Sequence, residues 1–228
     1  MLVKLIAHMG SDLTVVNAAR VSFDKESKWE EVLPAGQVEG LLREDDERLI
    51  KYLARHGHWS PFAHGSMQFR IKAPIFVARQ LVKHQVGLAW NEISRRYVDS
   101  EPEFYIPDTW RAKADNKKQG SSDEEIDINP PYDLGRRMLD PYQIQLSYIV
   151  KTYEHLLKLG VCPEQARMIL PLSLMTEWYW SGSLFAFSRV CNQRCKDDAQ
   201  KETQEIAWGI DKHARELFPT SWAELRKE

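Results

Sequence analysis

The sequence predicts an α+β fold: mixed helices and an antiparallel sheet in a single domain, residues 1–228, with one polar loop insertion. Apolar residues recur every three or four positions in some segments and alternate with polar residues in others. The two kinds of segment interleave without the strand–helix rhythm of a parallel sheet. With 43% hydrophobic and 28% charged residues, the 228-residue chain has enough apolar mass for one globular core.

The N-terminal quarter predicts two short strands and a helix. Residues 2–8 and 13–16 are apolar and rich in valine, leucine and isoleucine, as strands often are. The segment 38–58 predicts a helix that ends at Gly57. Its apolar face would be formed by Leu41, Leu42, Leu49, Ile50 and Leu53.

Strict alternation in residues 66–73 predicts a strand with one buried face, formed by Met67, Phe69 and Ile71. Pro74 suits the first turn of a helix, where its missing N–H is not needed, so a helix is expected over 75–84. Residues 93–106 are expected to be extended.

Residues 111–135 are polar and rich in turn-forming residues. They predict an exposed loop insertion that lies away from the chemistry. The rest of the chain predicts, in order, a helix over 141–159, a short helix over 163–167, an extended segment over 172–183, and helices over 183–194 and 197–217.

The charge balance and apolar runs exclude several classes of protein. The 31 basic and 33 acidic residues nearly cancel, which argues against a general nucleic-acid binder. No run approaches the roughly 20 apolar residues that span a bilayer, so we expect a soluble, cytoplasmic protein with no membrane contact. The three cysteines include Cys191 and Cys195, four residues apart. They match no zinc pattern, and we expect free thiols and no metal.

The segment KHQVGLAWNEISRRY, residues 83–97, gathers polar groups directly after an apolar helix. Gln80 and Lys83 would leave one helical turn, with His84 beside them. If a strand follows, its side chains at Glu92, Ser94 and Arg96 would share one face. A carboxylate beside guanidinium groups suits a ligand with an imide-like edge and a phosphate. The alternative is a solvated strand with surface ion pairs of little energetic value.

Other polar residues are ambiguous when taken singly. The histidines His56, His58 and His64 lie close in sequence, but no carboxylate or cysteine completes a metal-ligand set beside them. A hydrogen-bonding role is therefore expected for them. Arg167 and Arg194 would each be ordinary surface residues if considered alone. The glycine-rich and nucleophile motifs of common nucleotide-binding and hydrolase folds are absent from the sequence.

Five segments, taken together, resemble the flavin-dependent thymidylate synthases. They are HGHWSPFAH, IKAPIFVARQLVKHQ, NEISRRY, ARMILPLSL and NQRCKDDAQKE, in this order. The resemblance runs from about residues 17–23 to the last helix. The family signature has Arg-His-Arg, seven residues and then Ser, whereas this chain has Lys83-His84-Gln85, eight residues and then Ser94. Arg95 stands where the family commonly has Gly. The family's flavin-contacting Asn residues are also missing near Ser183 and Arg189.

The resemblance implies a homotetramer that methylates dUMP to dTMP, with active sites where subunits meet. It implies FAD as cofactor, with NADPH as reductant and methylenetetrahydrofolate as one-carbon donor. The residues implied for FAD binding are His58, Ser60, His84, Gln85 and Asn91. Those implied for dUMP binding are Gln80, Lys83, Glu92, Ser94, Arg95, Arg96, Arg167 and Arg194.

Arg194 is the expected catalytic residue. The C5 atom of uracil is a poor nucleophile, and residues 80–96 contain no cysteine that could activate it by addition to the ring. An arginine aimed at the uracil carbonyl would instead stabilise the developing enolate charge, and the flavin would supply the hydride. Ser94 would need an adjacent base to act as a nucleophile. Since His84 is expected to contact flavin, Ser94 is expected to bind the substrate.

Two alternatives remain open from the sequence. One is a related flavin enzyme that modifies another pyrimidine nucleotide, or that leaves a hydroxymethyl group in place of a methyl group. The other is a non-catalytic module that binds a nucleotide or RNA, against which the near-neutral charge counts.

Overall fold

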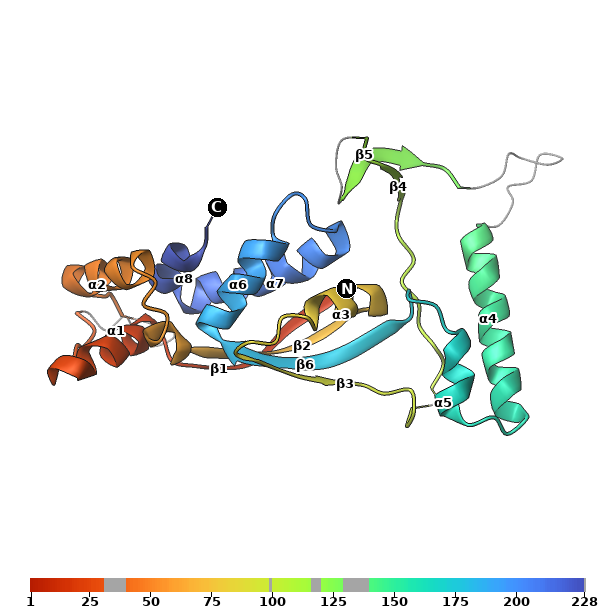
Figure 1. Ribbon diagram of the computed structural model, residues 1–228, viewed down its shortest axis with the longest axis horizontal. Coiled ribbons are helices and arrows are strands. Elements are labelled where there is room, and N and C mark those ends of the chain that lie inside the picture. The colour runs from red at the N-terminus through yellow and green to blue at the C-terminus, as the bar shows by residue number, and fades with distance from the viewer. Residues whose placement is uncertain (31–39, 99, 116–119, 129–139, 228) are drawn as a thin grey trace.

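The computed structural model describes residues 1–30, 40–98, 100–115, 120–128 and 140–227. A four-stranded antiparallel sheet has helices packed on one face, and an arm that carries the helix α4 extends at one end (Figure 1). The predicted α+β class is confirmed, because helices and antiparallel strands share one core.

The strand order in the sheet is β1-β2-β6-β3. The bounds of these strands are β1 Leu2–Met9, β2 Ser66–Pro74, β3 Leu88–Glu92 and β6 Met175–Ser183. The predicted alternation of β2 is confirmed, because Met67, Phe69 and Ile71 are all buried. Phe69 pairs with Trp180 and Ile71 with Trp178, so bulky side chains from β2 and β6 meet on the covered face.

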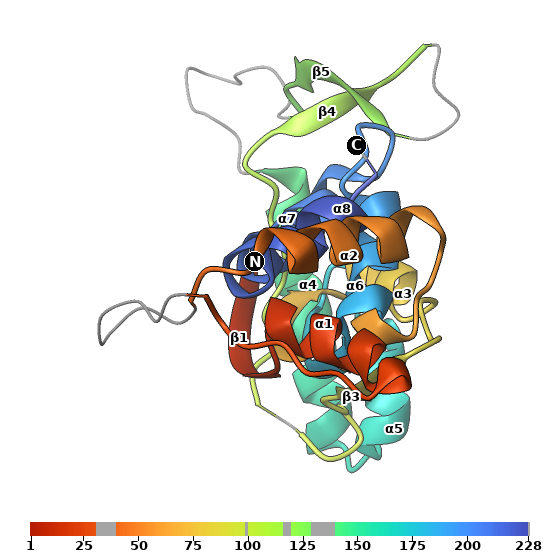
Figure 2. The ribbon, with the colours of Figure 1, turned by 90° about the vertical axis from the view of Figure 1, so that its left-hand side faces the viewer.

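Helices α3, α6 and α7 contact the strands of the sheet, and α1, α2 and α8 add side chains to the same core. Their bounds are α1 Asp12–Arg20, α2 Glu44–Arg55, α3 Ile75–Leu81, α6 Leu184–Arg194, α7 Lys201–Leu217 and α8 Pro219–Leu225. The predicted apolar stripe of α7 is confirmed by the burial of Ile206, Ile210 and Ala214. Helices α1 and α2 pack against α8 at one end of the molecule (Figures 1 and 2). Helix α8 was not among the predicted elements.

The prediction of a strand over 13–16 is wrong, because these residues belong to α1. Ser11 and Thr14 form a capping box that starts the helix, and Val15 and Val16 are both fully buried. Tertiary burial and the cap override the strand propensity of the two valines. The helix predicted over 38–58 begins only at Glu44, after which acidic side chains fill the first turn. Leu41 is exposed outside the helix, and residues 38–39 lie outside the described residues.

The expectation of an extended segment from residue 93 is also wrong at its start. Strand β3 ends at Glu92, and Arg95–Tyr97 form a turn. The guanidinium of Arg95 donates hydrogen bonds to the backbone carbonyls of Ser100 and Glu101, which closes the segment on itself. Ser94 and Arg96 therefore do not continue the strand face that carries Glu92.

Two strands lie where the polar loop was expected. Strand β4, Trp110–Lys113, pairs with β5, Ser121–Ile126, as a separate antiparallel sheet. An ion pair between Arg111 and Glu202 and another between Asp123 and Lys201 tie this hairpin to the start of α7. Turn-rich composition did not reveal these long-range contacts. Residues 116–119 and 129–135 of the expected loop lie outside the described residues.

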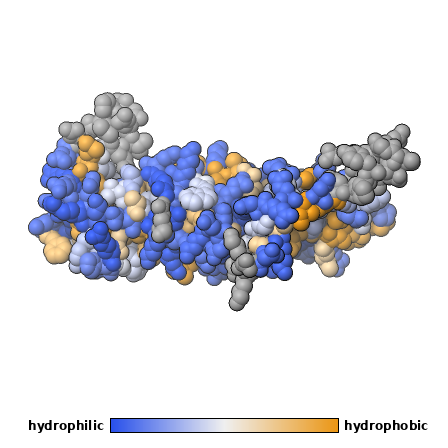
Figure 3. Space-filling view, turned by 90° about the horizontal axis from the view of Figure 1, so that it is seen from above, coloured by the Kyte–Doolittle hydropathy of each residue, from blue (hydrophilic) through white to orange (hydrophobic). Residues whose placement is uncertain are grey.

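The remaining elements follow the predictions closely. They are α4 Pro141–Lys158, α5 Pro163–Ala166, a 3₁₀ turn Arg167–Ile169, and β6 in the predicted extended segment. Hydrophobic residues gather toward the end of the molecule that carries α4, as Figure 3 shows from above. Among the described residues, no helix combines the length and hydropathy needed to cross a bilayer.

Candidate active site

A tight turn joins α3 to β3 and carries the centre of the polar segment. Gly87 has a positive φ of 78°, a conformation that side chains rarely tolerate. A Cβ atom at Gly87 would also lie 3.1 Å from the Cβ of Ala186 on α6. Glycine therefore allows the turn to approach α6 closely, which brings His84 and Gln85 beside that helix.

Arg194, at the end of α6, donates a hydrogen bond from Nε to Nε2 of His84 over 3.1 Å. Burial, together with the positive charges of Arg194 and Arg189, lowers the pKa of His84 from 6.5 to about 4. His84 is therefore neutral at neutral pH, and its Nε2 lone pair holds the arginine in place. The predicted catalytic residue and a predicted flavin residue form one unit.

Arg194 lines two cavities. The first, which we call the His84 cavity, has a volume of about 390 Å³ and is lined by Lys83, His84, Gln85, Val86, Leu88, Ala186, Arg189, Gln193 and Arg194. The second, the Gln80 cavity, has about 410 Å³ and is lined by Gln80, Arg111, Gly120, Ser121, Arg194, Asp198, Ala199, Gln200 and Lys201. Five of the predicted site residues, including Arg194 itself, thus meet around this arginine.

Gln80 is held at the start of α7. Its side-chain nitrogen donates to Oε1 of Gln200, and its oxygen accepts from the hydroxyl of Thr203 over 3.3 Å. These contacts orient the amide at the wall of the Gln80 cavity. Arg111 lines the same cavity. The sequence predicted that residues 111–135 lie away from the chemistry, whereas the hairpin of β4 and β5 reaches this candidate site.

Glu92 and Asn91 lie at the end of β3 on opposite faces of the sheet, because successive strand residues alternate. Glu92 accepts hydrogen bonds from Thr176 Oγ1 over 2.7 Å and from Trp90 Nε1 over 3.1 Å. Asn91 pairs instead beside Tyr179. A strand face common to Glu92, Ser94 and Arg96 is therefore not formed.

The other predicted residues lie at exposed positions or in surface turns. Arg96 donates from Nε to Ser94 Oγ over 3.2 Å, within the turn after β3. Arg167 is exposed in the 3₁₀ turn after α5, and His58 and Ser60 are exposed in the loop after α2. Within the part of the chain that the structure describes, these exposed residues do not line the His84 cavity or the Gln80 cavity. In a single chain, the predicted residues therefore fall into separate groups: those around Arg194, and those at exposed positions away from the two cavities.

Sequence reasoning missed Arg111 and Lys201 as cavity residues. Arg111 was placed in a polar loop, and its partner Glu202 is 91 residues further along the chain. No local pattern indicates such a pairing. For Lys201, the available signal was its place near the start of the helix predicted over 197–217. Helix N-termini bind anions, so a residue there is a candidate for contact with an anionic ligand.

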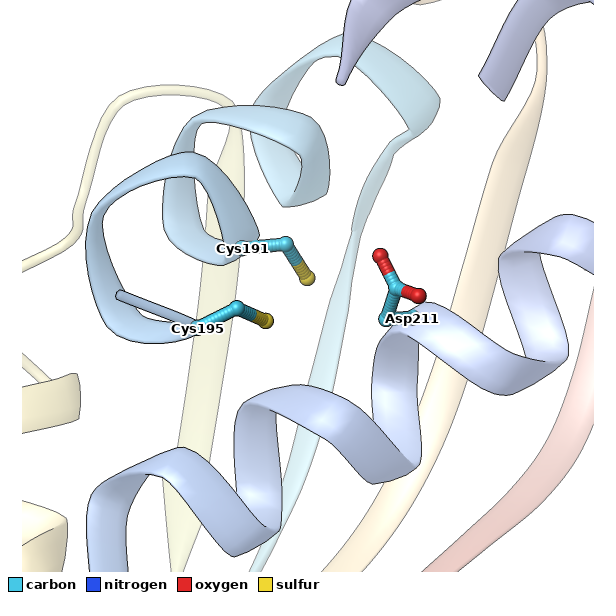
Figure 4. A group of neighbouring side chains, drawn as sticks. All are labelled: Cys191, Cys195 and Asp211. Carbon is cyan, nitrogen blue, oxygen red and sulfur yellow. The ribbon is translucent and has the colours of Figure 1, made fainter. Parts of the chain in front are cut away.

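Cys191, Cys195 and Asp211 form a buried group between α6 and α7 (Figure 4). One potential ligand atom from each lies within 4.8 Å of the others. Asp211 already accepts hydrogen bonds from Trp222 Nε1 and from the guanidinium of Arg226 on one oxygen, and from Arg215 on the other. Two guanidinium groups on the only carboxylate disfavour a cation there. These contacts indicate a structural group, in which burial raises the pKa of Cys191 well above its usual value.

Known proteins are similar to this chain over nearly its whole length. A family model described as "Thymidylate synthase complementing protein" matches residues 4–220. A flavin-dependent thymidylate synthase of Thermosipho africanus is 36% identical over 226 residues, covering 98% of this chain and 90% of the relative. Another from Thermotoga neapolitana is 37% identical over 226 residues, covering 96% and 88%.

A solved structure is also similar to this chain over nearly its whole length. The UMP/dUMP methylase PolB from Streptomyces cacaoi, bound with 5-Br dUMP, is 29% identical and superposes with a TM-score of 0.74. The alignment covers 98% of this chain and 93% of that one. Since the sequence and the fold both match along their length, the chain is an enzyme of the flavin-dependent thymidylate synthase family.

Proposed function

We propose that this enzyme carries out the reductive methylation of dUMP to dTMP, with FAD as cofactor, methylenetetrahydrofolate as one-carbon donor and NADPH as reductant. Family membership supports the reaction class. The observation that carries the proposal for this chain is the hydrogen bond to His84 from Arg194, the residue that lines both cavities. It connects the Arg194 guanidinium, which would act on the pyrimidine, to the His84 imidazole, which is expected to contact the flavin.

The His84 cavity fits part of a flavin nucleotide. Its lining includes Lys83, Arg189 and Arg194 and contains no carboxylate, so it suits a ligand that carries a pyrophosphate. Neutral His84 and the amide of Gln85 offer polar contacts beside the apolar side chain of Leu88. His58, Ser60 and Asn91 would contribute from elsewhere in the assembly. What a reduced flavin supplies when bound is the hydride that converts the one-carbon unit to a methyl group.

Arg194 acts on the pyrimidine in this proposal. Its hydrogen bond to His84 uses the Nε–H, so the terminal nitrogens keep their N–H donors for a substrate carbonyl. Donation to the uracil carbonyl stabilises negative charge there as C5 becomes nucleophilic. Because His84 is neutral, it holds the guanidinium without adding a competing positive charge. Gln80, fixed by Gln200 and Thr203, presents an amide that can pair with the imide edge of uracil.

The other predicted dUMP residues would complete the site from a neighbouring subunit. Lys83 lines the His84 cavity, but five other residues expected at the dUMP site do not line either cavity of the described chain: Glu92, Ser94, Arg95, Arg96 and Arg167. An assembly in which one subunit's Arg194 faces another subunit's Ser94 would bring them together. We therefore propose a homotetramer with active sites between subunits, working in the cytoplasm.

A second candidate substrate is UMP. The structural relative is named a UMP/dUMP methylase, and it was also solved with 5-Br UMP, at 26% identity and a TM-score of 0.71. The curated relatives at 36% and 37% identity carry the thymidylate synthase name, which favours dUMP. The difference between the two substrates is one ribose hydroxyl.

The test is product analysis with flavin-loaded protein. Incubation with dUMP or UMP, methylenetetrahydrofolate and NADPH is followed by mass spectrometry of the nucleotide. A gain of one CH₂ on dUMP supports the proposal, the same gain on UMP supports the second candidate, and a gain of CH₂O indicates hydroxymethylation. Colourless protein that forms no modified nucleotide even after FAD is added would contradict both. Light scattering on the same preparation tests the tetramer.

A further inference from the structure

A chain of polar side chains connects the β4–β5 hairpin to Gln80. Arg111 of β4 donates from Nε to Ser121 Oγ over 2.8 Å and from Nη2 to Oε1 of Glu202 over 2.6 Å. At the other end, the side-chain nitrogen of Gln80 donates to Oε1 of Gln200. Glu202 and Gln200 lie two residues apart at the start of α7. The chain therefore runs from a charged hairpin to an amide on the wall of the Gln80 cavity.

The Glu202 carboxylate in the middle of this chain is ionised at neutral pH. Burial raises its pKa, but the hydrogen bond and charge of Arg111, its own backbone N–H and the side chain of Gln200 outweigh burial and leave the pKa below its usual value. The side chain is only 7% exposed. An ionised carboxylate can only accept hydrogen bonds, so each neighbouring side chain must turn a donor toward it.

This requirement fixes the orientation of two amides in succession. An amide has a donor end and an acceptor end, and a half-turn of the group exchanges them. Because Glu202 only accepts, Gln200 turns its nitrogen to Glu202 and its oxygen to Gln80. The Gln80 nitrogen donates to that oxygen, and the Gln80 oxygen accepts from the Thr203 hydroxyl over 3.3 Å. Thr203 does not choose between the two orientations, since a hydroxyl can donate or accept.

The orientation of the Gln80 amide decides which base can pair with it. With one N–H and one lone pair used inside the protein, the amide keeps one donor and one acceptor for a ligand. The N3–H and a carbonyl oxygen of uracil complement this pair. Cytosine has an acceptor at N3 and an amino group at C4, so a cytosine held by Arg194 in the same position needs the opposite orientation. A donor facing a donor, or an acceptor facing an acceptor, is costly.

We propose, on the basis of the proposed function in which Gln80 pairs with the pyrimidine, that Glu202 and Gln200 are positioning residues that set the preference for uracil over cytosine nucleotides. They do so by fixing the donor and acceptor ends of the Gln80 amide. Within the described part of the chain, Glu202 does not line the Gln80 cavity, so it acts through Gln200. Arg111 holds the carboxylate in place, which gives the hairpin a role in substrate choice.

The test is calorimetric titration of the flavin-loaded enzyme with dUMP and with dCMP. Wild type should bind dUMP at least about tenfold more tightly than dCMP, because cytosine would oppose like groups. The readout is the ratio of the dCMP and dUMP dissociation constants. Partial loss of folding or of flavin weakens binding of both nucleotides together and leaves this ratio unchanged, whereas a lost orientation of Gln80 lowers it.

Two variants release the orientation in different ways. Glu202→Gln gives Gln200 a neighbour that offers both a donor and an acceptor, and Gln200→Leu removes the amide that connects Glu202 to Gln80. We expect each variant to lower the ratio at least about fivefold. Thr203→Val is the matched control. It removes a different hydrogen bond to the same Gln80 amide but keeps Gln200 and Glu202, so its ratio should stay within about twofold of wild type. Circular dichroism and bound flavin absorbance confirm that each variant is folded.

Several results would overturn the inference. They are equal binding of dUMP and dCMP by wild type, a wild-type ratio in both Glu202→Gln and Gln200→Leu, or a ratio for Thr203→Val that falls as far as theirs. Formation of dTMP by wild type is assayed separately. An enzyme that makes dTMP while both variants keep the wild-type ratio contradicts the positioning role alone and leaves the proposed function standing. A protein that makes no dTMP but shows the expected change in ratio contradicts the proposed function and supports the positioning role.

Discussion

The Nε–H of Arg194 and the Nε2 atom of His84 meet over 3.1 Å, although the two residues are 110 positions apart in the chain. This contact locks the end of α6 to the turn after α3. It makes the orientation of the arginine depend on a neutral imidazole. His84 lines the His84 cavity, and Arg194 lines both that cavity and the Gln80 cavity.

If Arg194 stabilises charge on the pyrimidine, Arg194→Ala should lower turnover by roughly 10²–10³-fold, as loss of one oxyanion donor does. Arg194→Lys should recover only part, because an ammonium cannot make the planar two-point contact. Steady-state dTMP formation at saturating dUMP and folate, on flavin-replete protein, measures this. Arg79→Ala, an exposed change on α3, is the control. Turnover of Arg194→Ala within about twofold of wild type would refute the catalytic role.

The lowered pKa of His84 predicts a pH-dependent stability. The unfolded chain takes up the proton near pH 6.5, whereas the folded chain resists it until about pH 4. The stabilisation is therefore complete above about pH 6.5 and is lost as the pH falls toward about 4. Because His84 is only half-buried, solvent screening reduces the effect to about 1–2 kcal/mol.

Urea unfolding at about pH 7 and about pH 5 measures this term. His84→Gln should remove it, so the stability of the variant should change less than that of wild type between the two pH values. The exposed histidine His56, changed to Gln, is the control. The prediction fails if wild type and His84→Gln lose the same stability on acidification.

Asp211 should be essential to folding and indifferent to metal. Its carboxylate accepts from Arg226 Nε over 2.6 Å and from Trp222 Nε1 over 3.0 Å, and the Arg226 side chain is only 6% exposed. Asp211→Ala leaves that guanidinium buried without its carboxylate, although the Asn192 amide oxygen still accepts from it, at a cost of about 3–5 kcal/mol. Denaturant unfolding measures the loss, with the exposed Asp197→Ala as control. Equal stabilities, or an Asp211 effect that zinc or a chelator alters, would contradict the structural role.

Gly182→Ala should disturb the site from within the sheet. A Cβ at Gly182 would lie 2.7 Å from the carbonyl oxygen of Gly87 and would overlap the side chain of Leu88. Relief of that overlap must move the start of β3, next to the turn that carries His84. We expect a loss of about 1–3 kcal/mol in stability and a lower retained flavin content. Ser181→Ala is the neighbouring control, and wild-type flavin content in folded Gly182→Ala would count against the coupling.

The sequence by itself determined the elements whose local pattern matches their burial. The alternation around Phe69 predicted β2, and the spacing of Ile206, Ile210 and Ala214 predicted α7. In both cases the side chains that repeat at the period of the element are the ones that pack in the core, so periodicity alone reports the structure. The motifs around His84 and Arg194 also indicated the family without any coordinates.

Only the tertiary structure decided where short or polar segments went. Val15 and Val16 are strand formers by propensity, yet they belong to α1. A helix cap starts this helix, and both valine side chains are completely buried in it. The pairing of Arg111 with Glu202 turned a loop-like stretch into a tethered hairpin beside the Gln80 cavity. Contacts between residues about a hundred positions apart depend on how the elements pack, and no local period encodes them. The same packing brought Arg194 to His84.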